Sequence, residues 1–109
     1  MKISDSQEWK GIWVFIEQEE GCVAEVSYEL LAVARQLSAK RESAEVVALL
    51  LGRGVKGLAG DLPAYGADRV LWVDHPSLEK YLTLPYTRVV GQLIREGKPE
   101  IFLLPATSA

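Results

Sequence analysis

The chain has 109 residues, which is about the length of one domain. Hydrophobic residues make up 49% and charged residues 25%, and this ordinary globular composition excludes a disordered tail, a collagen-like fibre and a disulfide scaffold. The net charge is −3, from 12 basic and 15 acidic residues. Because a nucleic-acid-binding domain is usually strongly basic, we expect no nucleic-acid partner.

The sequence contains no feature of export or of membrane insertion. No apolar run approaches the roughly 18 residues that a membrane span requires. Residues 1–10 are interpreted as a polar N-terminal extension, without the apolar stretch of a signal peptide, and residues 11–109 as a single α/β domain. A single cysteine, Cys22, excludes an intrachain disulfide and is compatible with a reducing compartment. We therefore predict a cytoplasmic domain with no membrane contact.

Four apolar runs predict the strands of a parallel sheet. Each run is continuously apolar, which is typical of strands that are covered on both faces. Enough chain separates successive runs for a crossover connection, so together they predict repeated βαβ units. The runs are residues 12–16, 46–51, 70–73 and 101–104.

Three helices are expected between these strands. In the first, Ser27 is the predicted N-cap, and an apolar stripe is formed by Leu30, Leu31, Ala34 and Leu37. The second, over residues 54–64, is expected to be short because Gly57 and Gly60 dilute it.

The third helix has the clearest pattern. Pro85 suits its first turn, and Gly97 is predicted to be a left-handed C-cap. Its apolar stripe is formed by Tyr86, Val89, Val90, Leu93 and Ile94.

These elements predict an α/β fold with an open parallel sheet, β-α-β-α-β-α-β. The fold is Rossmann-like (adenine-nucleotide alpha-hydrolase-like), with strand order 3-2-1-4. We expect it to be truncated after the fourth strand, because only residues 105–109 follow and no covering helix is predicted there. An apolar fourth strand at a sheet edge predicts that the isolated chain self-associates or needs a partner.

A glycine motif follows the second strand. Gly52, Gly54 and Gly57 fit the dinucleotide-binding pattern G-x-G-x-x-G, and Asp74 lies where that pattern expects a ribose-binding carboxylate. However, dinucleotides bind at the switch point between strands one and four, whereas this motif follows strand two. The helix after it is also short. We therefore favour a glycine-rich turn over a phosphate site.

The remaining chemically interesting residues do not predict a catalytic or metal site. His75 could be oriented by Asp74 for acid–base work, but no nucleophile is placed to complete a hydrolase triad, so a turn is favoured. Cys22 lies in an acidic loop and lacks further metal ligands. Trp13 and Trp72 are predicted core residues, and Trp9 is expected to be the tryptophan that meets a partner. We predict no catalytic, cofactor-binding or metal-binding residue.

Several segments, in order, resemble the N-terminal domain of the electron transfer flavoprotein alpha subunit. The resemblance spans about residues 11 to 107, and the stretch Tyr65-Gly66-Ala67-Asp68 is its most specific part. The similar segments are residues 14–18, 27–31, 47–52, 64–70 and 98–101, followed by Ala106-Thr107.

The resemblance implies a role in electron transfer without redox chemistry in this chain. In the family, FAD is held mainly by the C-terminal domain of alpha, with help from the beta subunit. The present sequence contains no such domain, so no flavin-contacting residue is carried over and no cofactor is expected here. The complete protein would carry electrons through FAD between dehydrogenases and a downstream acceptor. This domain would bind the beta subunit and would not be an enzyme.

One alternative comes from a different class. A free-standing nucleotide-binding domain of the universal-stress type would use the glycines at 52, 54 and 57. Against it, no second glycine-rich phosphate loop follows the fourth strand.

Overall fold

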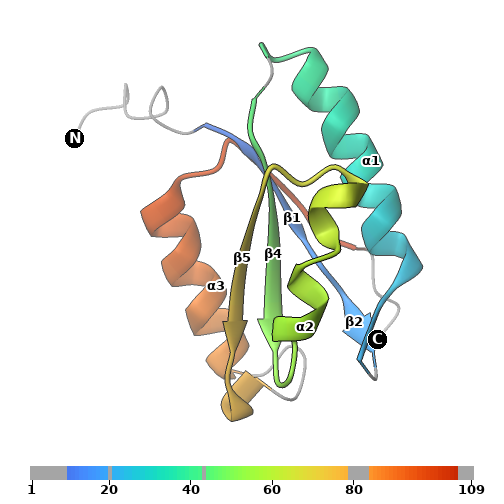
Figure 1. Cartoon of the computed structure of the whole chain (residues 1–109). Helices are drawn as coiled ribbons and strands as arrows, with labels where there is room; N and C mark the ends of the chain where they lie inside the picture. The colour runs from blue at the N-terminus through green and yellow to red at the C-terminus, as the bar shows by residue number, and fades with distance from the viewer. Residues whose placement is uncertain (1–9, 20, 43, 79–83, 106–109) are drawn as a thin grey trace, which may run out of the picture.

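The computed structural model describes residues 10–19, 21–42, 44–78 and 84–105, and it shows a parallel sheet between helices on both faces (Figure 1). The sheet has the order β5-β4-β1-β6, and each neighbouring pair is parallel. This order is the predicted 3-2-1-4, so the four predicted strands and their arrangement are confirmed. The strands are β1 (Ile12–Phe15), β4 (Val46–Gly52), β5 (Arg69–Asp74) and β6 (Ile101–Leu103).

The two central strands form the middle of the core. Every residue of β1 and β4 is buried, as their uninterrupted apolar sequences predict. In the register of the sheet, Ile12 of β1 lies beside Val46 of β4 and Ile101 of β6. Because side chains alternate along a strand, the two faces carry two separate apolar clusters, one around Val14 and Leu50 and the other around Trp13 and Leu49.

Helix α1 (Glu25–Ala39) covers the Val14 face of the sheet. Leu31 and Ala34 are fully buried there, which confirms the predicted stripe. The predicted cap at Ser27 is wrong, because the helix begins at Glu25, with Ala24 as its N-cap residue. Ser27 is buried and needs internal partners: its Oγ accepts a hydrogen bond from the Glu17 amide (2.8 Å) and donates to the Glu17 carbonyl (3.2 Å). It thereby ties the helix to the end of β1.

The predicted second helix is two short pieces on the same face. They are α2 (Lys56–Ala59) and the 3-10 turn η2 (Leu62–Tyr65). Leu62 is fully buried and anchors the second piece, and Gly66 ends it in the left-handed conformation with φ 117°. The predicted weakness of this helix is confirmed.

Helix α3 (Leu84–Gly97) covers the opposite face, over Trp13 and Phe15. Pro85 lies in its first turn, as predicted. The predicted left-handed cap is wrong in its position, because Lys98, with φ 48°, takes that conformation and Gly97 does not. Gly97 has a packing role instead: a Cβ at this residue would overlap the Trp13 ring.

Two features of the fold were not predicted. A small antiparallel hairpin, β2 (Gln18–Glu19) and β3 (Cys22–Val23), lies between β1 and α1. Trp72, predicted to be a core residue, is 42% exposed because β5 is an edge strand and α2 is too short to cover it. Trp9 and the rest of the expected N-terminal extension, apart from Lys10, lie outside the described residues.

The other edge of the sheet is β6. Ile101 and Leu103 face α1 and Phe102 faces α3; all three are half-buried, and Leu104 is 58% exposed. The short strand is therefore an edge with apolar side chains on both faces, as predicted. Residues 106–109 are outside the described part of the chain. Among the described helices, none has both the length and the apolar character needed to cross a membrane.

Candidate functional site

The glycine motif forms a tight turn between β4 and α2. Gly54 has φ 72°, a conformation that favours glycine. A Cβ at Gly52 would lie 2.7 Å from Val55 Cγ1 and 2.8 Å from Gln18 Nε2, so this glycine allows close packing. In the register of the sheet, Asp74 lies beside Gly52.

Asp74 binds the amides that a phosphate would need. The Gly54 amide donates to Asp74 Oδ1 (2.8 Å), and the Lys56 amide donates to Asp74 Oδ2 (3.1 Å). These hydrogen bonds, that from Gly54 foremost, hold the pKa of Asp74 below its ordinary value, so the carboxylate is ionised at neutral pH. A nucleotide phosphate would have to displace this anion and would be repelled by it. The structure therefore favours the turn interpretation and disfavours the universal-stress alternative.

The switch point between β1 and β6 offers no better phosphate site. The helix that starts beyond β1 is α1, and Glu25 lies in its first turn, where a carboxylate opposes anion binding. The chain between them is occupied by the β2–β3 hairpin and by the contact of Ser27 with Glu17. Neither of these two places fits the diphosphate of FAD.

His75 and Cys22 take no part in a chemical constellation among the described residues. His75 Nδ1 accepts a hydrogen bond from the Ser77 amide (3.0 Å) and lies 2.8 Å from Ser77 Oγ, so it closes the turn that begins η3 (Pro76–Leu78). Cys22 is exposed in the hairpin. No group of three or more His, Cys, Asp or Glu side chains in the described ranges could hold a metal ion.

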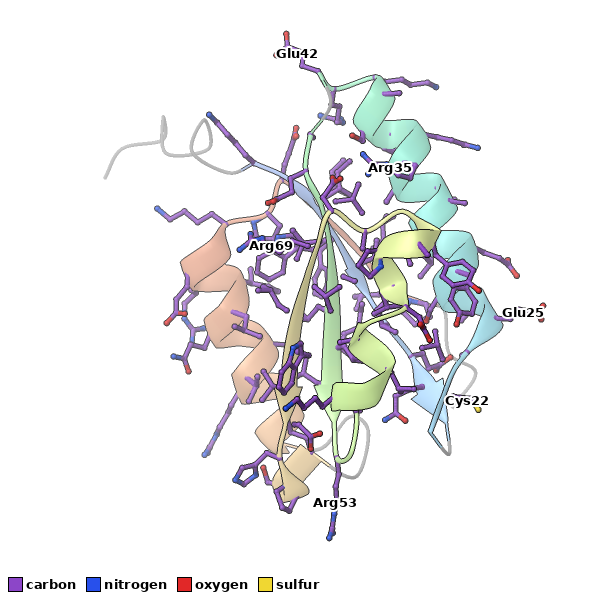
Figure 2. All side chains as sticks on the ribbon, in the orientation of Figure 1. Cys22, Glu25, Arg35, Glu42, Arg53 and Arg69 are labelled. Carbon is purple, nitrogen blue, oxygen red and sulfur yellow. The ribbon has the colours of Figure 1, made fainter. Side chains whose placement is uncertain are left out.

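Charged side chains are spread over the surface instead of gathering at one place. Figure 2 shows Glu42, Arg53 and Cys22 at three separate corners of the molecule. A cavity of about 420 Å³ at the amino ends of the strands mixes Lys10 and Arg41 with glutamates, so it favours neither anions nor cations.

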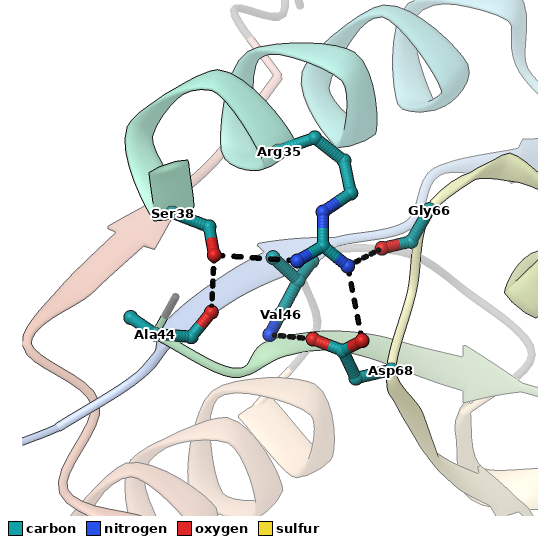
Figure 3. Close-up of polar contacts among 6 residues, drawn as sticks. All are labelled: Arg35, Ser38, Ala44, Val46, Gly66 and Asp68. Carbon is teal, nitrogen blue, oxygen red and sulfur yellow. Dashed lines mark hydrogen bonds and ion pairs between the residues drawn. The ribbon is translucent and has the colours of Figure 1, made fainter. Parts of the chain in front are cut away.

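The densest polar network surrounds Arg35 on α1 (Figure 3). Arg35 Nη1 donates to the Gly66 carbonyl (2.9 Å) and to Asp68 Oδ1 (3.0 Å), and Nη2 donates to Ser38 Oγ (3.2 Å). Asp68 Oδ2 accepts from the amide of buried Val46 (2.8 Å). The network joins α1, the start of β4 and the turn before β5.

This network explains the most specific part of the family resemblance. Gly66 is required because its φ is 117° and because a Cβ there would lie 2.8 Å from Arg35 Cγ. Two further motif residues meet nearby: the rings of Tyr28 and Tyr65 lie 4.2 Å apart between α1 and η2. Burial, and then the neighbouring Tyr65, raises the pKa of Tyr28 above its ordinary value. The motif therefore organises a structural junction and contains no reactive group in the described chain.

Sequence reasoning did not find Arg35 or Ser38. Both lie on the buried side of α1, and Ser38 Oγ donates to the Ala44 carbonyl (2.6 Å). The available signal was an arginine placed directly after a buried helical residue, Ala34, where a purely apolar stripe would continue.

Comparisons with known proteins agree with this architecture. The family profile described as the electron transfer flavoprotein domain matches residues 12–109. The chain is 46% identical over 104 residues to the electron transfer flavoprotein subunit alpha of Megasphaera elsdenii, covering 95% of this chain and 30% of the relative. It is 44% identical over 107 residues to the protein FixB of Clostridium saccharobutylicum, covering 98% and 30%. It is 40% identical over 105 residues to the acryloyl-CoA reductase electron transfer subunit beta of Anaerotignum propionicum, covering 96% and 28%.

Fold and site together define an α/β domain of Rossmann-like architecture whose glycine turn is closed by its own aspartate. The chain belongs to the electron transfer flavoprotein family and corresponds to the N-terminal domain of the alpha subunit. It spans between 28% and 30% of the length of the three relatives named above.

Proposed function

We propose that this domain is the partner-binding part of an electron transfer flavoprotein alpha subunit. The complete protein would carry electrons through FAD between dehydrogenases and a downstream acceptor, in the cytoplasm. The match of the family profile over residues 12–109 carries the proposal, together with identities of 39–46% to three alpha subunits.

The domain's own part in this function is structural. Its glycine turn is closed by Asp74, and the Arg35 network serves packing, so these residues hold no flavin and perform no redox step. Its partner is the beta subunit of the flavoprotein. The relative from Megasphaera elsdenii is named as an alpha subunit, which supports a heteromeric assembly.

Binding of the beta subunit is tested by mixing the purified chain with a beta subunit of the same family. We expect co-elution on size exclusion and a saturable heat of binding in titration calorimetry. The full alpha subunit of the Megasphaera elsdenii protein is the positive control. Separate elution and no heat at concentrations where that control binds would contradict the proposal.

Flavin binding by the chain alone is tested separately. Purified protein is expected to be colourless, and added FAD should keep its free fluorescence. Stoichiometric quenching of FAD at micromolar protein would show that the domain holds the cofactor and would overturn its structural role.

A further inference from the structure

Strand β5 presents an open edge. It pairs with β4 on one side, and no other described strand pairs with its opposite side. Figure 1 looks onto this edge, with α3 on the left face of the sheet and α1 and α2 on the right. Because the Asp68 amide donates to the Val46 carbonyl, the alternation of the strand directs the amides of Arg69, Leu71 and Val73 away from β4. The centre of the strand, residues 70–73, contains no charge or proline to block pairing.

A groove follows the edge on the α3 side. It has a volume of about 220 Å³, with Trp13, Leu71 and Leu93 among its apolar lining and Arg69 and Glu96 beside them. Arg69 is paired with Glu45 (3.2 Å), so its charge is already compensated. The volume is below the roughly 300–1,000 Å³ of small-molecule pockets, so the groove fits one large side chain.

The opposite face of the same strand is different. Trp72 is 42% exposed there, and Lys56 Nζ lies 5.9 Å from the centre of its ring. No ion pair to Lys56 is present within the described residues. The nearby Asp74 carboxylate does not compensate this ammonium, because its oxygens accept from backbone amides. A carboxylate on a partner would complement Lys56 beside the exposed aromatic ring.

These observations specify one kind of occupant. A strand that pairs with β5 points successive side chains to opposite faces, so one enters the groove and the next meets Lys56 and Trp72. We propose that the edge of β5 binds an extended segment of another polypeptide, with an apolar side chain in the groove and an acidic side chain at Lys56. A small molecule in the groove would not reach both faces. The inference is independent of the proposed binding of the beta subunit.

The test uses the full chain and synthetic peptides. The probe is a capped peptide of alternating leucine and glutamate, and one control peptide carries N-methyl groups on the leucines, which block strand pairing. A second control replaces glutamate by lysine. Binding is measured by fluorescence anisotropy, and the contacted residues by backbone NMR shifts.

We expect saturable binding of the glutamate peptide, with shifts centred on residues 69–74. N-methylation should weaken it by at least about tenfold, or about 1.4 kcal/mol. Lys56→Glu should also weaken it by about tenfold and should invert the preference between the glutamate and lysine peptides. Lys40→Glu is the matched control, because Lys40 is exposed at the far end of α1 and should leave binding unchanged.

Four results would overturn the proposal. They are equal binding of the N-methylated peptide, equal effects of Lys56→Glu and Lys40→Glu, shifts centred away from β5, and no saturable binding of the glutamate peptide. Self-association through β5 in the absence of peptide would identify a second copy as the occupant and would equally overturn it.

Discussion

Removing the Asp68 carboxylate tests which contact holds the Arg35 junction together. Asp68 accepts hydrogen bonds from the Val46 amide and from Arg35, and Val46 is fully buried. Asp68→Ala leaves that amide without its acceptor. Asp68→Asn keeps a carbonyl oxygen for the amide and removes the ion pair with Arg35. The two variants therefore separate the hydrogen bond from the charge.

The magnitude follows from the exposure of the two side chains. A hydrogen bond to a charged acceptor contributes about 1.5–3 kcal/mol. The side chains of Asp68 and Arg35 are 43% and 40% exposed, so solvent screens the ion pair, and we assign it about 0.5 kcal/mol. We expect Asp68→Ala to lower the free energy of unfolding by about 2 kcal/mol and Asp68→Asn by about 0.5 kcal/mol.

Thermal and urea unfolding measure these changes. With about 4–8 °C per kcal/mol in a domain of this size, the melting temperature should fall by about 8–16 °C for alanine and about 2–4 °C for asparagine. Glu45→Ala removes a carboxylate from the exposed ion pair with Arg69 and should change stability by less than about 0.5 kcal/mol. Equal losses for the alanine and asparagine variants would refute the reasoning that the Val46 hydrogen bond dominates.

The same residue gives a pH dependence. The Val46 hydrogen bond, opposed by burial and assisted by Arg35, lowers the pKa of Asp68 in the folded protein. Its ionic stabilisation is therefore complete above the unfolded pKa of about 3.9 and is lost as the pH falls through the lower folded pKa. The stability advantage of the wild type over Asp68→Asn should shrink over that acidic window and stay constant from pH 6 to 8 (roughly two units above the unfolded pKa).

Three further predictions concern other parts of the fold. Because Asp74 fills the glycine turn, ATP, AMP and NAD should leave the melting temperature unchanged; binding at a hundred times the dissociation constant would add about 2.7 kcal/mol and raise it by about 10 °C or more. Gly97→Ala should destabilise by about 1–3 kcal/mol through overlap with Trp13, whereas Gly91→Ala in the same helix, facing only the tip of Arg95, should stabilise by about 0.4–1 kcal/mol. If the isolated chain self-associates through β6, Leu104→Thr should shift sedimentation equilibrium toward monomer and Val33→Thr should not; a clean 12.0 kDa species for the unmodified chain would remove the hypothesis.

The strands could be predicted because burial alone decides them. Residues 12–16 and 46–51 are apolar at every position, and a strand buried on both faces is the structure that needs such a sequence. Strand order followed from the handedness of the crossovers. The exposure of Trp72 could not be predicted, because it depends on how far the short α2 reaches over β5.

Local capping and polar contacts were harder to predict. Ser27 has the composition of an N-cap, but its hydroxyl is bound to Glu17 across the hairpin, a tertiary contact that overrides local preference. Gly97 resembles a left-handed cap, yet its lack of a side chain is needed for Trp13, a residue 84 positions earlier (97 − 13). Phe102, expected to face outward, contacts Trp13 in a T-shaped arrangement with ring centres 6.4 Å apart.

The Arg35 junction also bears on the order in which the chain folds. Its contacts join residues 31 and 33 positions apart, from Arg35 to Gly66 and Asp68, so they can form only after α1, β4 and η2 have come together. Closing so long a loop is entropically costly, and contacts of this kind are typically absent from the folding transition state. Loss of the Asp68 carboxylate should therefore accelerate unfolding and leave the refolding rate nearly unchanged. The most specific motif of this sequence would then set how long the native state lasts.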